Sequence, residues 1–332
     1  MIKVLVTGAG AVLGQGIVRA LRISALDLEI AAADPNPLSP ALFWVDRGYI
    51  IPPAIDPEFI SCVSDVLDQE RPDIVLVGTD VELPHFARHR EELERAFATR
   101  VLVSSPRVVD IADDKFETFN FLLSAGLDPP RSALPEHSSS LRSLVEEVGY
   151  PLVVKPRIGA RSIGVSIVNN DAALESAIDG RSGLVVQELA GAADQEFTSS
   201  ALVFDGVAAA SVVMRRDLRD GNTHRAFVEP FEDLNLFVRR AAEALQPFGP
   251  VNFQFRVDAR GNPRIFEINA RFSGATPLRA LAGFNEVEMC IRKLIFGEPI
   301  QPQPLRNGTI LRHLTETFVT DSDIGRLRQS NR

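Results

Sequence analysis

The sequence predicts an α/β protein with a doubly wound parallel sheet at its N-terminus and two α+β lobes after it. Over roughly the first hundred residues, short apolar strands alternate with helical stretches, which is typical of a parallel sheet with helices on both faces. From about residue 113 a second unit begins, in which helices and strands are accompanied by a glycine-bearing loop. A chain of 332 residues is also too long for one ordinary core, which favours two or three packed units.

The first unit is expected to span residues 1–112. Its short apolar runs predict strands and its longer amphipathic stretches predict helices. The expected strands are Lys3–Val6, Glu29–Ala33, Ile74–Val77 and Val101–Ser104. The expected helices are Ile17–Leu21, Phe59–Gln69 and Phe86–Phe97.

The second unit, residues 113–189, is expected to be a small α+β lobe. A helix over Lys115–Ala125 should stop at Gly126, since glycine ends helices and Pro129-Pro130 follows. The other expected helices are Leu141–Val148 and Ala172–Ile178, and the expected strands are Leu152–Lys155, Val165–Val168 and Leu184–Gln187.

The third unit, residues 190–332, is expected to be a larger lobe. Its predicted strands are Phe197–Phe204, Ala208–Met214, Val251–Val257 and Pro263–Ile268, with a helix over Leu234–Ala244. The stretch Met214–Arg219 is interpreted as irregular, and His224 is placed in a turn. The polar tail after Asp321 is expected to be frayed.

Composition excludes several classes of function. The net charge of −9 argues against a nucleic-acid surface, because phosphate backbones need an excess of Lys and Arg. Cys62 and Cys290 are far apart and lack metal-like spacing, so a reducing compartment fits best. The opening residues read as a strand, and no apolar run could span a bilayer. A cytoplasmic protein without membrane contact is therefore expected.

The N-terminal glycines allow two interpretations. Thr7-Gly8-Ala9-Gly10 follows a strand, and Asp34 ends the next one, as in a dinucleotide site. However, Leu13 stands where the third glycine of G-x-G-x-x-G belongs. The glycines then serve a tight turn and close helix packing, or a different ligand. A nicotinamide-dependent oxidoreductase stays open as an alternative.

A phosphate-binding loop is predicted where a buried strand ends in Lys155. The loop that follows runs from Arg157 to Gly164 and carries Gly159, Arg161 and Ser162. Its glycines allow backbone N–H groups to turn toward anionic oxygens, and the lysine adds a point charge. A lysine at a strand end without such a loop would more often be a surface residue.

A strand that leads into a linker suits adenine binding. Gln187-Glu188-Leu189 forms such a hinge, where two backbone groups and one side-chain acceptor can read the base. Eight residues further on, Glu196 is a candidate acceptor for a ribose diol. Either acid alone would be an ordinary surface glutamate.

A metal site is predicted on the hairpin formed by residues 251–257 and 263–269. Strand alternation puts Gln254 on one strand face, with Glu267 and Asn269 on one face of its neighbour. Three oxygen donors grouped in this way suit Mg²⁺, which prefers hard oxygen ligands. Arg271 would lie beside this site, where phosphoryl charge develops. Polar residues on the open side of a sheet are the alternative.

Taken together, these segments resemble an ATP-grasp enzyme. The resemblance rests on Asp114-Lys115, the Lys155 strand and loop, the hinge, and the Gln254, Glu267 and Asn269 set with Arg271. It is greatest to the large subunit of carbamoyl-phosphate synthase, and the first unit resembles the pre-ATP-grasp domain that precedes the catalytic lobes. The family's Asn-Pro-Arg is Asn-Ala-Arg here.

The resemblance implies roles for these residues. Lys115 and Lys155 would contact ATP phosphates, Glu188 and the Leu189 backbone would hold adenine, and Glu196 the ribose. Gln254, Glu267 and Asn269 would bind one or two Mg²⁺ ions, for which Mn²⁺ could substitute, and Arg271 would steady the transferred phosphoryl group. The loop adds Gly159, Arg161, Ser162 and Gly164 to these site residues, and the hinge adds Gln187.

The implied activity is that of an ATP-dependent ligase acting on a small-molecule carboxylate and an amine. Acceptor specificity is expected from the first unit and from Arg215 and Arg216, which would clamp an anion or line a solvated edge. The chain resembles about one synthetase half, so carbamoyl phosphate synthesis itself is not expected. A homodimer and a catalytically silent nucleotide-binding module also stay open.

Overall fold

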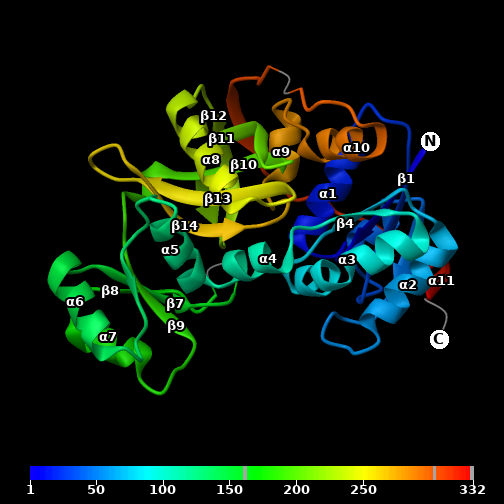
Figure 1. The fold of residues 1–332 in the computed structure, drawn as a ribbon. Coiled ribbons are helices and arrows are strands. Elements are labelled where there is room, and N and C mark those ends of the chain that lie inside the picture. The colour runs from blue at the N-terminus through cyan, green and yellow to red at the C-terminus, as the bar shows by residue number, and fades with distance from the viewer. Residues whose placement is uncertain (160–162, 302–303, 330–332) are drawn as a thin grey trace.

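The computed structural model describes residues 1–159, 163–301 and 304–329 of the chain. It contains three sheets, two of six strands and one of four (Figure 1). None of the described helices combines the length and apolar character needed to cross a bilayer. Both cysteines are free and buried.

The first sheet is parallel and has the strand order β16-β3-β2-β1-β4-β5. Its strands are β1 (Ile2–Thr7), β2 (Leu28–Asp34), β3 (Arg47–Ile50), β4 (Ile74–Val77), β5 (Arg100–Leu102) and β16 (Arg328–Gln329). The helices of this unit are α1 (Val12–Arg22), α2 (Phe59–Glu70), α3 (Leu83–Phe97) and α4 (Pro106–Asp113), with short 3₁₀ turns at Pro40–Phe43 (η1) and Asp80–Glu82 (η2). One face of the sheet packs under α2 and α3, and the other packs under α1.

The turn after β1 shows what the N-terminal glycines do. A Cβ on Gly14 would lie 2.3 Å from the carbonyl oxygen of Gly8, so α1 approaches the turn too closely for any side chain there. The buried Asp34 accepts hydrogen bonds from the N–H of Gly10 at 2.6 Å and the hydroxyl of Ser39 at 2.6 Å. Asp34, the acid that would bind the ribose in a dinucleotide site, thus accepts hydrogen bonds from the protein's own loops instead.

The small lobe contains an antiparallel sheet of order β6-β9-β7-β8. Its elements are β6 (Ser132–Ala133), β7 (Leu152–Pro156), β8 (Ser166–Val168), β9 (Leu184–Glu188), α6 (Ser138–Val148) and α7 (Asp171–Ile178). The helix α5 (Lys115–Ser124) precedes this sheet, yet its Leu122 packs into the core of the large lobe.

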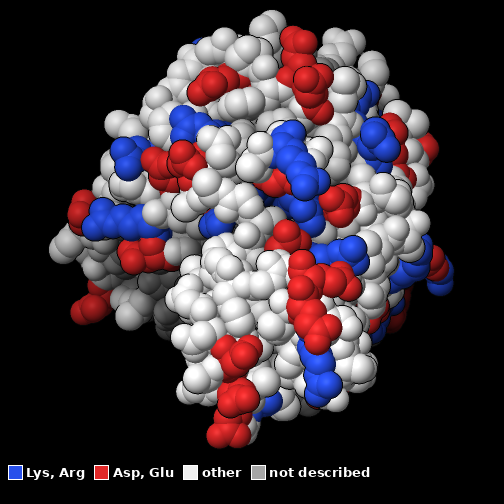
Figure 2. All heavy atoms as spheres, turned by 90° about the vertical axis from the view of Figure 1, so that its left-hand side faces the viewer, with Lys and Arg blue, Asp and Glu red and all other residues white. Residues whose placement is uncertain are grey.

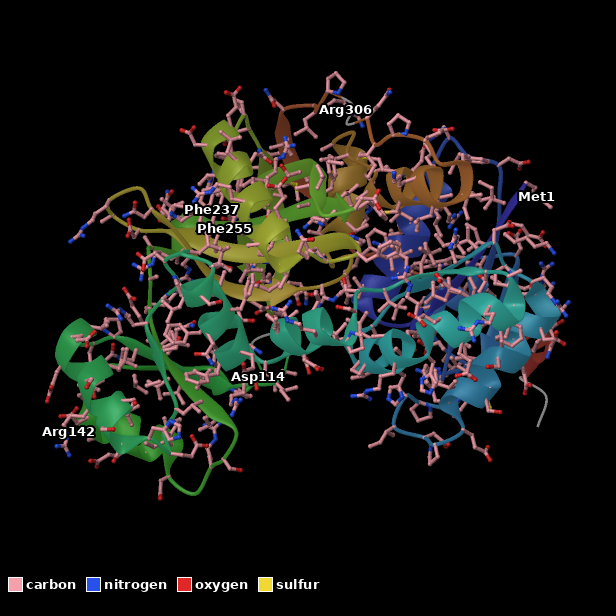
Figure 3. All side chains as sticks on the ribbon, viewed as in Figure 1. Met1, Asp114, Arg142, Phe237, Phe255 and Arg306 are labelled. Carbon is pink, nitrogen blue, oxygen red and sulfur yellow. The ribbon has the colours of Figure 1, made fainter. Side chains whose placement is uncertain are left out.

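The large lobe contains an antiparallel sheet of order β14-β13-β10-β11-β12-β15. Its elements are β10 (Glu196–Phe204), β11 (Val207–Arg219), β12 (Asn222–Val228), β13 (Gly249–Val257), β14 (Pro263–Asn269), β15 (Gly308–Leu311), α8 (Glu232–Leu245), α9 (Thr276–Leu281) and α10 (Glu286–Phe296), with a 3₁₀ turn at Ala193–Gln195 (η3). Phe237 of α8 lies next to Phe255 of β13, with ring centroids 6.1 Å apart (Figure 3).

Three predictions about the last unit are wrong. Met214–Arg219 is not irregular but continues β11, because it pairs with β12. His224 lies within β12 rather than in the turn, which falls at Asp220-Gly221. The tail is not frayed up to Gln329, since α11 (Asp321–Gly325) and β16 follow Thr320 and β16 pairs with β3. The first two errors come from missing the hairpin of β11 and β12, and the third from missing the pairing of two segments far apart in the chain.

The large lobe and the first unit share one hydrophobic core. Ile17 and Leu21 of α1 pack with Leu278 of α9 and with Val287 and Ile291 of α10. The same core continues into the sheet of the large lobe. Side chains on one face of the first sheet are therefore fixed relative to the large lobe.

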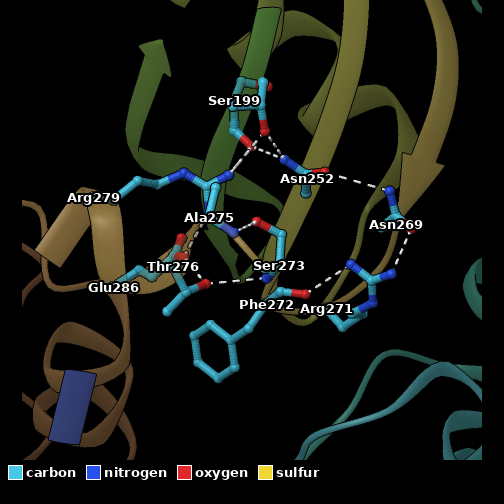
Figure 4. Close-up of polar contacts among 12 residues, drawn as sticks. Ser199, Asn252, Asn269, Arg271, Phe272, Ser273, Ala275, Thr276, Arg279 and Glu286 are labelled. Carbon is cyan, nitrogen blue, oxygen red and sulfur yellow. Dashed lines mark hydrogen bonds and ion pairs between the residues drawn. The ribbon is translucent and has the colours of Figure 1, made fainter. Parts of the chain in front are cut away.

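A buried ion pair anchors this joint (Figure 4). Arg279 of α9 donates to the Glu286 carboxylate of α10 at 2.7 Å, and both side chains are fully buried. Arg279 also donates to the carbonyl of Ser199 on β10 at 2.9 Å. Asn252 of β13 donates to the same carbonyl, so the network leads from the helices into the sheet. Within the described residues, Arg279 Nε and one Glu286 oxygen have no hydrogen-bond partner.

Removing one charge of this pair should destabilise the protein more than removing both. Arg279→Met leaves Glu286 buried without its cation and should lower the free energy of unfolding by about 3–5 kcal/mol. Arg279→Met combined with Glu286→Leu should recover much of that loss, because no unpaired charge remains. Urea unfolding followed by circular dichroism measures both variants. A double variant no more stable than Arg279→Met would contradict this account.

Candidate functional site

Two adjoining cavities lie between the three units. The large cavity, of about 510 Å³, is lined by the first unit, by the start of α5 and by the large sheet. The small cavity, of about 210 Å³, is lined by the sheet of the small lobe and by the large sheet. Both cavities are lined by Lys115, Gly159, Arg216, Gly221, Gln254 and Glu267.

Lys155 is buried at the small cavity, near the end of β7. Its ammonium group donates to the side-chain oxygen of Gln187 on β9 at 2.7 Å and to the Phe266 carbonyl on β14 at 3.4 Å. Burial lowers the pKa of Lys155 to about 8, an effect that Glu267 opposes and Lys115 reinforces. Lys155 and Gln187, which the sequence assigned to one site, therefore do lie together.

The glycine loop is tied to the start of α5. The ammonium group of Lys115 donates to the carbonyls of Arg157 at 3.2 Å and Gly159 at 2.8 Å. Asp114 caps α5 and accepts two hydrogen bonds from Arg157, at 3.1 and 2.6 Å. Asp114 lies between the end of α4 and the start of α5, next to the small lobe (Figure 3). Lys115 thus contacts the loop that was expected to cover phosphates.

The other predicted loop residues differ in position. Gly159 lines both cavities. Gly164 does not line either cavity, although Ile163 and Val165 beside it line the small one. Arg161 and Ser162 lie outside the described residues.

The hinge residues Glu188 and Leu189 line the small cavity. The Glu188 carboxylate accepts from the Arg131 N–H at 2.9 Å and from the Arg264 guanidinium at 3.0 Å. Arg264 belongs to β14, so this contact fixes the hinge to the large sheet. The adenine contact assigned to Glu188 stays a prediction.

Glu196 is buried in an ion-pair cluster that the sequence did not predict. One of its oxygens accepts from Arg216 at 2.7 Å and the other from Arg256 at 2.7 Å. The predicted ribose contact would therefore compete with two guanidinium groups. Arg216 also donates to the side-chain oxygen of Gln254 at 2.6 Å. The pairing of Arg216 with Glu196 can be found from sequence only by aligning β10 with β11, and a bulge near Leu202 shifts that register.

The three candidate metal ligands lie side by side. Gln254 pairs with Glu267 across β13 and β14, and Asn269 is two residues further along β14. One Glu267 oxygen accepts from the Gln254 amide at 2.7 Å and from the Asn269 amide at 3.0 Å. The amide oxygens instead accept from Arg216 and Arg271.

This set fits a Mg²⁺ ion in its chemistry. It offers one carboxylate and two amide oxygens once both amides turn by half a rotation. The described residues contain no group of three His, Cys, Asp or Glu side chains placed for a metal. The proposed set is of a different kind, because two of its three ligands, Gln254 and Asn269, are amides.

Arg271 links the end of β14, which carries Glu267 and Asn269, to the first unit. It donates to both oxygens of Asp80, at 2.6 and 2.9 Å, and to the side-chain oxygen of Asn269 at 2.7 Å. Burial would raise the pKa of Asp80, but the adjacent Arg271 guanidinium outweighs it and holds that pKa below its usual range. Asp80 was not among the site residues predicted from the sequence.

Two more lining residues of the large cavity have titratable side chains that sequence analysis missed. Asp113 ends α4, and burial together with the nearby Asp80 raises its pKa. Arg312 follows β15, whose edge position in the large sheet was not foreseen. Neither residue has a local motif, so no signal in the sequence marks them.

The outer face of the small lobe and hairpin has a mixed charge (Figure 2). Acidic and basic side chains alternate over this face, and no continuous basic surface covers it. This face therefore lacks the continuous row of Lys and Arg side chains that binding of a phosphate backbone requires.

Comparisons with known families agree with this geometry. Residues 4–101 match the family of PylC-like N-terminal domains. Residues 112–230 match the RimK-like ATP-grasp domain, and residues 182–317 match an ATP-grasp family in the biosynthetic pathway with the Ter operon.

Among curated proteins, the multifunctional protein CAD of Squalus acanthias is 24% identical over 296 residues, 83% of this chain. The carbamoyl phosphate synthase large chain of Methanoregula boonei is 26% identical over 187 residues, 52% of this chain. The matches span only 13% and 17% of those two proteins. The sequence-based resemblance to the synthase large subunit is thereby confirmed.

Solved structures show the same fold. The ADP complex of purK, an N5-carboxyaminoimidazole ribonucleotide synthetase, has a TM-score of 0.72 at 17% identity, covering 92% of this chain and 79% of that one. An L-amino acid ligase from Bacillus licheniformis has a TM-score of 0.64 at 21% identity, covering 91% and 78%.

The two ATP-grasp family models together cover residues 112–317, which include both cavities' β-strand walls. The parallel sheet before them is the matched N-terminal domain. The chain therefore belongs to the ATP-grasp superfamily.

Proposed function

We propose that the protein is an ATP- and Mg²⁺-dependent ligase that activates a carboxylate as an acyl phosphate for attack by an amine. The observation that carries this proposal is the wall shared by the two cavities, which contains Glu267, Gln254 and Lys115. A nucleotide in the small cavity would present its phosphates at this wall. An acid in the large cavity would present its carboxylate from the other side.

The small cavity supports nucleotide binding. The hinge of Glu188 and Leu189 offers backbone and carboxylate groups to a base, and Lys155 and Lys115 offer cations to phosphates. Gln254, Glu267 and Asn269 would hold Mg²⁺, which neutralises phosphate charge when bound. Arg161 and Ser162 belong to this proposal on sequence grounds alone.

The reaction has two balanced steps. A carboxylate oxygen of the acid bonds to the γ-phosphorus of ATP while the bond to the β-phosphate oxygen breaks, giving an acyl phosphate and ADP. An amine nitrogen then bonds to the acyl carbon, phosphate leaves, and the amine loses a proton as the amide forms. Lys115, Lys155 and Arg271 would align and stabilise the anions, and the closed loop would exclude water.

Several finer assignments belong to this proposal. The acid and the amine are small molecules, and one or two metal ions, Mg²⁺ or Mn²⁺, would serve. A homodimer and a cytoplasmic location stay predictions. Carbamoyl phosphate synthesis is not proposed, because the curated relatives extend far beyond the region that they share with this chain.

The nicotinamide alternative loses its structural basis, because Asp34 already binds Gly10 and Ser39. A silent nucleotide-binding module would be expected to have lost part of its site. Here both lysines and all three oxygen donors are present and face the cavities.

The direct test is ADP release that depends on an added acid. With Mg²⁺ and hydroxylamine as the amine, the substrate acid should yield ADP and a hydroxamate in equal amounts. A thermal-shift screen of amino and sugar acids with magnesium nucleotide finds candidate acids, since a ligand of the folded state raises Tm. Calorimetry should show ATP or ADP binding and no comparable NADH binding. Tighter binding of NADH than of ATP would refute the assignment.

The metal set predicts a loss of turnover without a loss of fold. Glu267→Gln keeps an acceptor for its amide neighbours but removes the charge, and Asn269→Ala removes an oxygen donor. Each should lower kcat by about a hundredfold or more while Tm changes little. Glu229→Gln, an exposed carboxylate outside both cavities, is the matched control. Severe unfolding of both site variants would support a structural role instead.

ATP affinity should decrease above pH 8. The free protein holds Lys155 with a pKa of about 8, so below that pH the cation is present and above it the cation is lost. The Kd for ATP should therefore rise by up to roughly tenfold for each pH unit between 8 and 10. Lys155→Arg keeps its charge over this range and should flatten the profile, as calorimetry at several pH values can show. An equally steep profile in Lys155→Arg would exclude Lys155 as the cause.

A further inference from the structure

The cations that line the large cavity are not equivalent. Arg216 is paired with Glu196, and Arg271 is paired with Asp80. Lys115 is bound by the carbonyls of the glycine loop. Arg312 is different, because no carboxylate lies within ion-pair distance of it in residues 1–159, 163–301 and 304–329.

The position of Arg312 is fixed by the large sheet. Its backbone N–H donates to the His224 carbonyl of β12 at 3.0 Å, directly after the β15 pairing. Its guanidinium donates to the Gly274 carbonyl, and most of its other N–H groups have no acceptor among the described residues. Arg312 lines only the large cavity, whereas Glu267 lines both. The guanidinium is therefore held away from the nucleotide cavity.

The surroundings of Arg312 add no negative charge. Burial lowers its pKa, and the nearby Arg19 lowers it further. A cation held partly out of water beside a second cation is costly unless an anion joins it. No carboxylate of the described residues supplies that anion.

The start of α1 adds to this environment. Val12 begins the helix and lines the same cavity, and a Cβ on Gly274 would lie 3.4 Å from its side chain. The helix has no side-chain cap, so its first N–H groups and the positive end of its dipole stay available at that wall. Both features favour a negatively charged ligand group beside Arg312.

We propose that Arg312 binds a second anionic group of the acid that the enzyme activates. On this proposal, which rests on the ligase function above, the substrate carries a reacting carboxylate near Glu267 and a further carboxylate or phosphate at Arg312. Arg312 is then a specificity-determining residue, and the acceptor class is a dicarboxylic or phosphorylated carboxylic acid. The cavity of about 510 Å³ has room for such a molecule.

Binding is tested with matched pairs of acids in the full chain. Succinate, glutarate and adipate are compared with butyrate, valerate and hexanoate, and 3-phosphoglycerate with glycerate, each with magnesium and a non-hydrolysable ATP analogue. The acids with a second anionic group should raise Tm more than their monoanionic partners. Whether the dicarboxylates or 3-phosphoglycerate give the larger shift decides between a carboxylate and a phosphate.

The variants separate Arg312 from general charge effects. Arg312→Gln should abolish the preference for the dianion and weaken its binding by roughly tenfold to a hundredfold, and Arg312→Lys should restore part of it. The Kd for ATP should be unchanged in both. Arg306→Gln is the matched control, since Arg306 also donates to a carbonyl but lies at the outer edge of the structure (Figure 3). It should behave as wild type.

Turnover distinguishes failure of this proposal from failure of the ligase function. With hydroxylamine as the amine, Arg312→Gln should raise KM for the dianion and leave kcat nearly unchanged. The proposal is overturned if no dianion outperforms its monoanionic partner in wild type, or if Arg312→Gln and wild type bind dianions equally. A dianion that binds through Arg312 without ADP release would instead reject the ligase function and keep the subsite.

Discussion

The site depends on the ion pair between Arg271 and Asp80, because this pair connects the end of β14 to the N-terminal unit. Asp80 belongs to the first unit and Arg271 to the large lobe, and the large cavity lies where these two units meet. The buried pair of Arg279 and Glu286 reinforces this joint, since it holds α9 and α10 against the sheet that carries Asn252 and Asn269 (Figure 4). A change in the packing of the first unit would therefore move the wall on which phosphoryl transfer is proposed.

Charges in the cavities are mostly satisfied by other protein groups before any ligand binds. Lys115 binds loop carbonyls, Lys155 binds Gln187, and the amide nitrogens of Gln254 and Asn269 face Glu267. Nucleotide and metal would have to take over these contacts, so part of their binding free energy would replace existing hydrogen bonds. The existing hydrogen bonds keep the charged groups in position before the ligands bind. The site is in this sense preorganised.

Sequence could predict whatever depends on neighbours along the chain. Alternation on one hairpin was enough to bring Glu267 and Gln254 together, and a buried strand with a glycine loop was enough to mark Lys155. It could not show that Arg216 pairs with Glu196 or that Arg312 reaches the large cavity, because these positions follow from pairing across a bulge and from an edge strand formed far along the chain. The same limit explains why the tail was misjudged. Long-range register, rather than local propensity, was the missing information.

The shared wall of the two cavities has a thermodynamic consequence. Six residues line both cavities, Glu267 and Arg216 among them, so a ligand bound in one cavity would change the charges that a ligand in the other meets. Linkage requires the effect to be reciprocal: if nucleotide strengthens acid binding by some factor, the acid strengthens nucleotide binding by the same factor. A measured affinity for either ligand alone therefore describes only one of the four binding steps that connect the four ligation states.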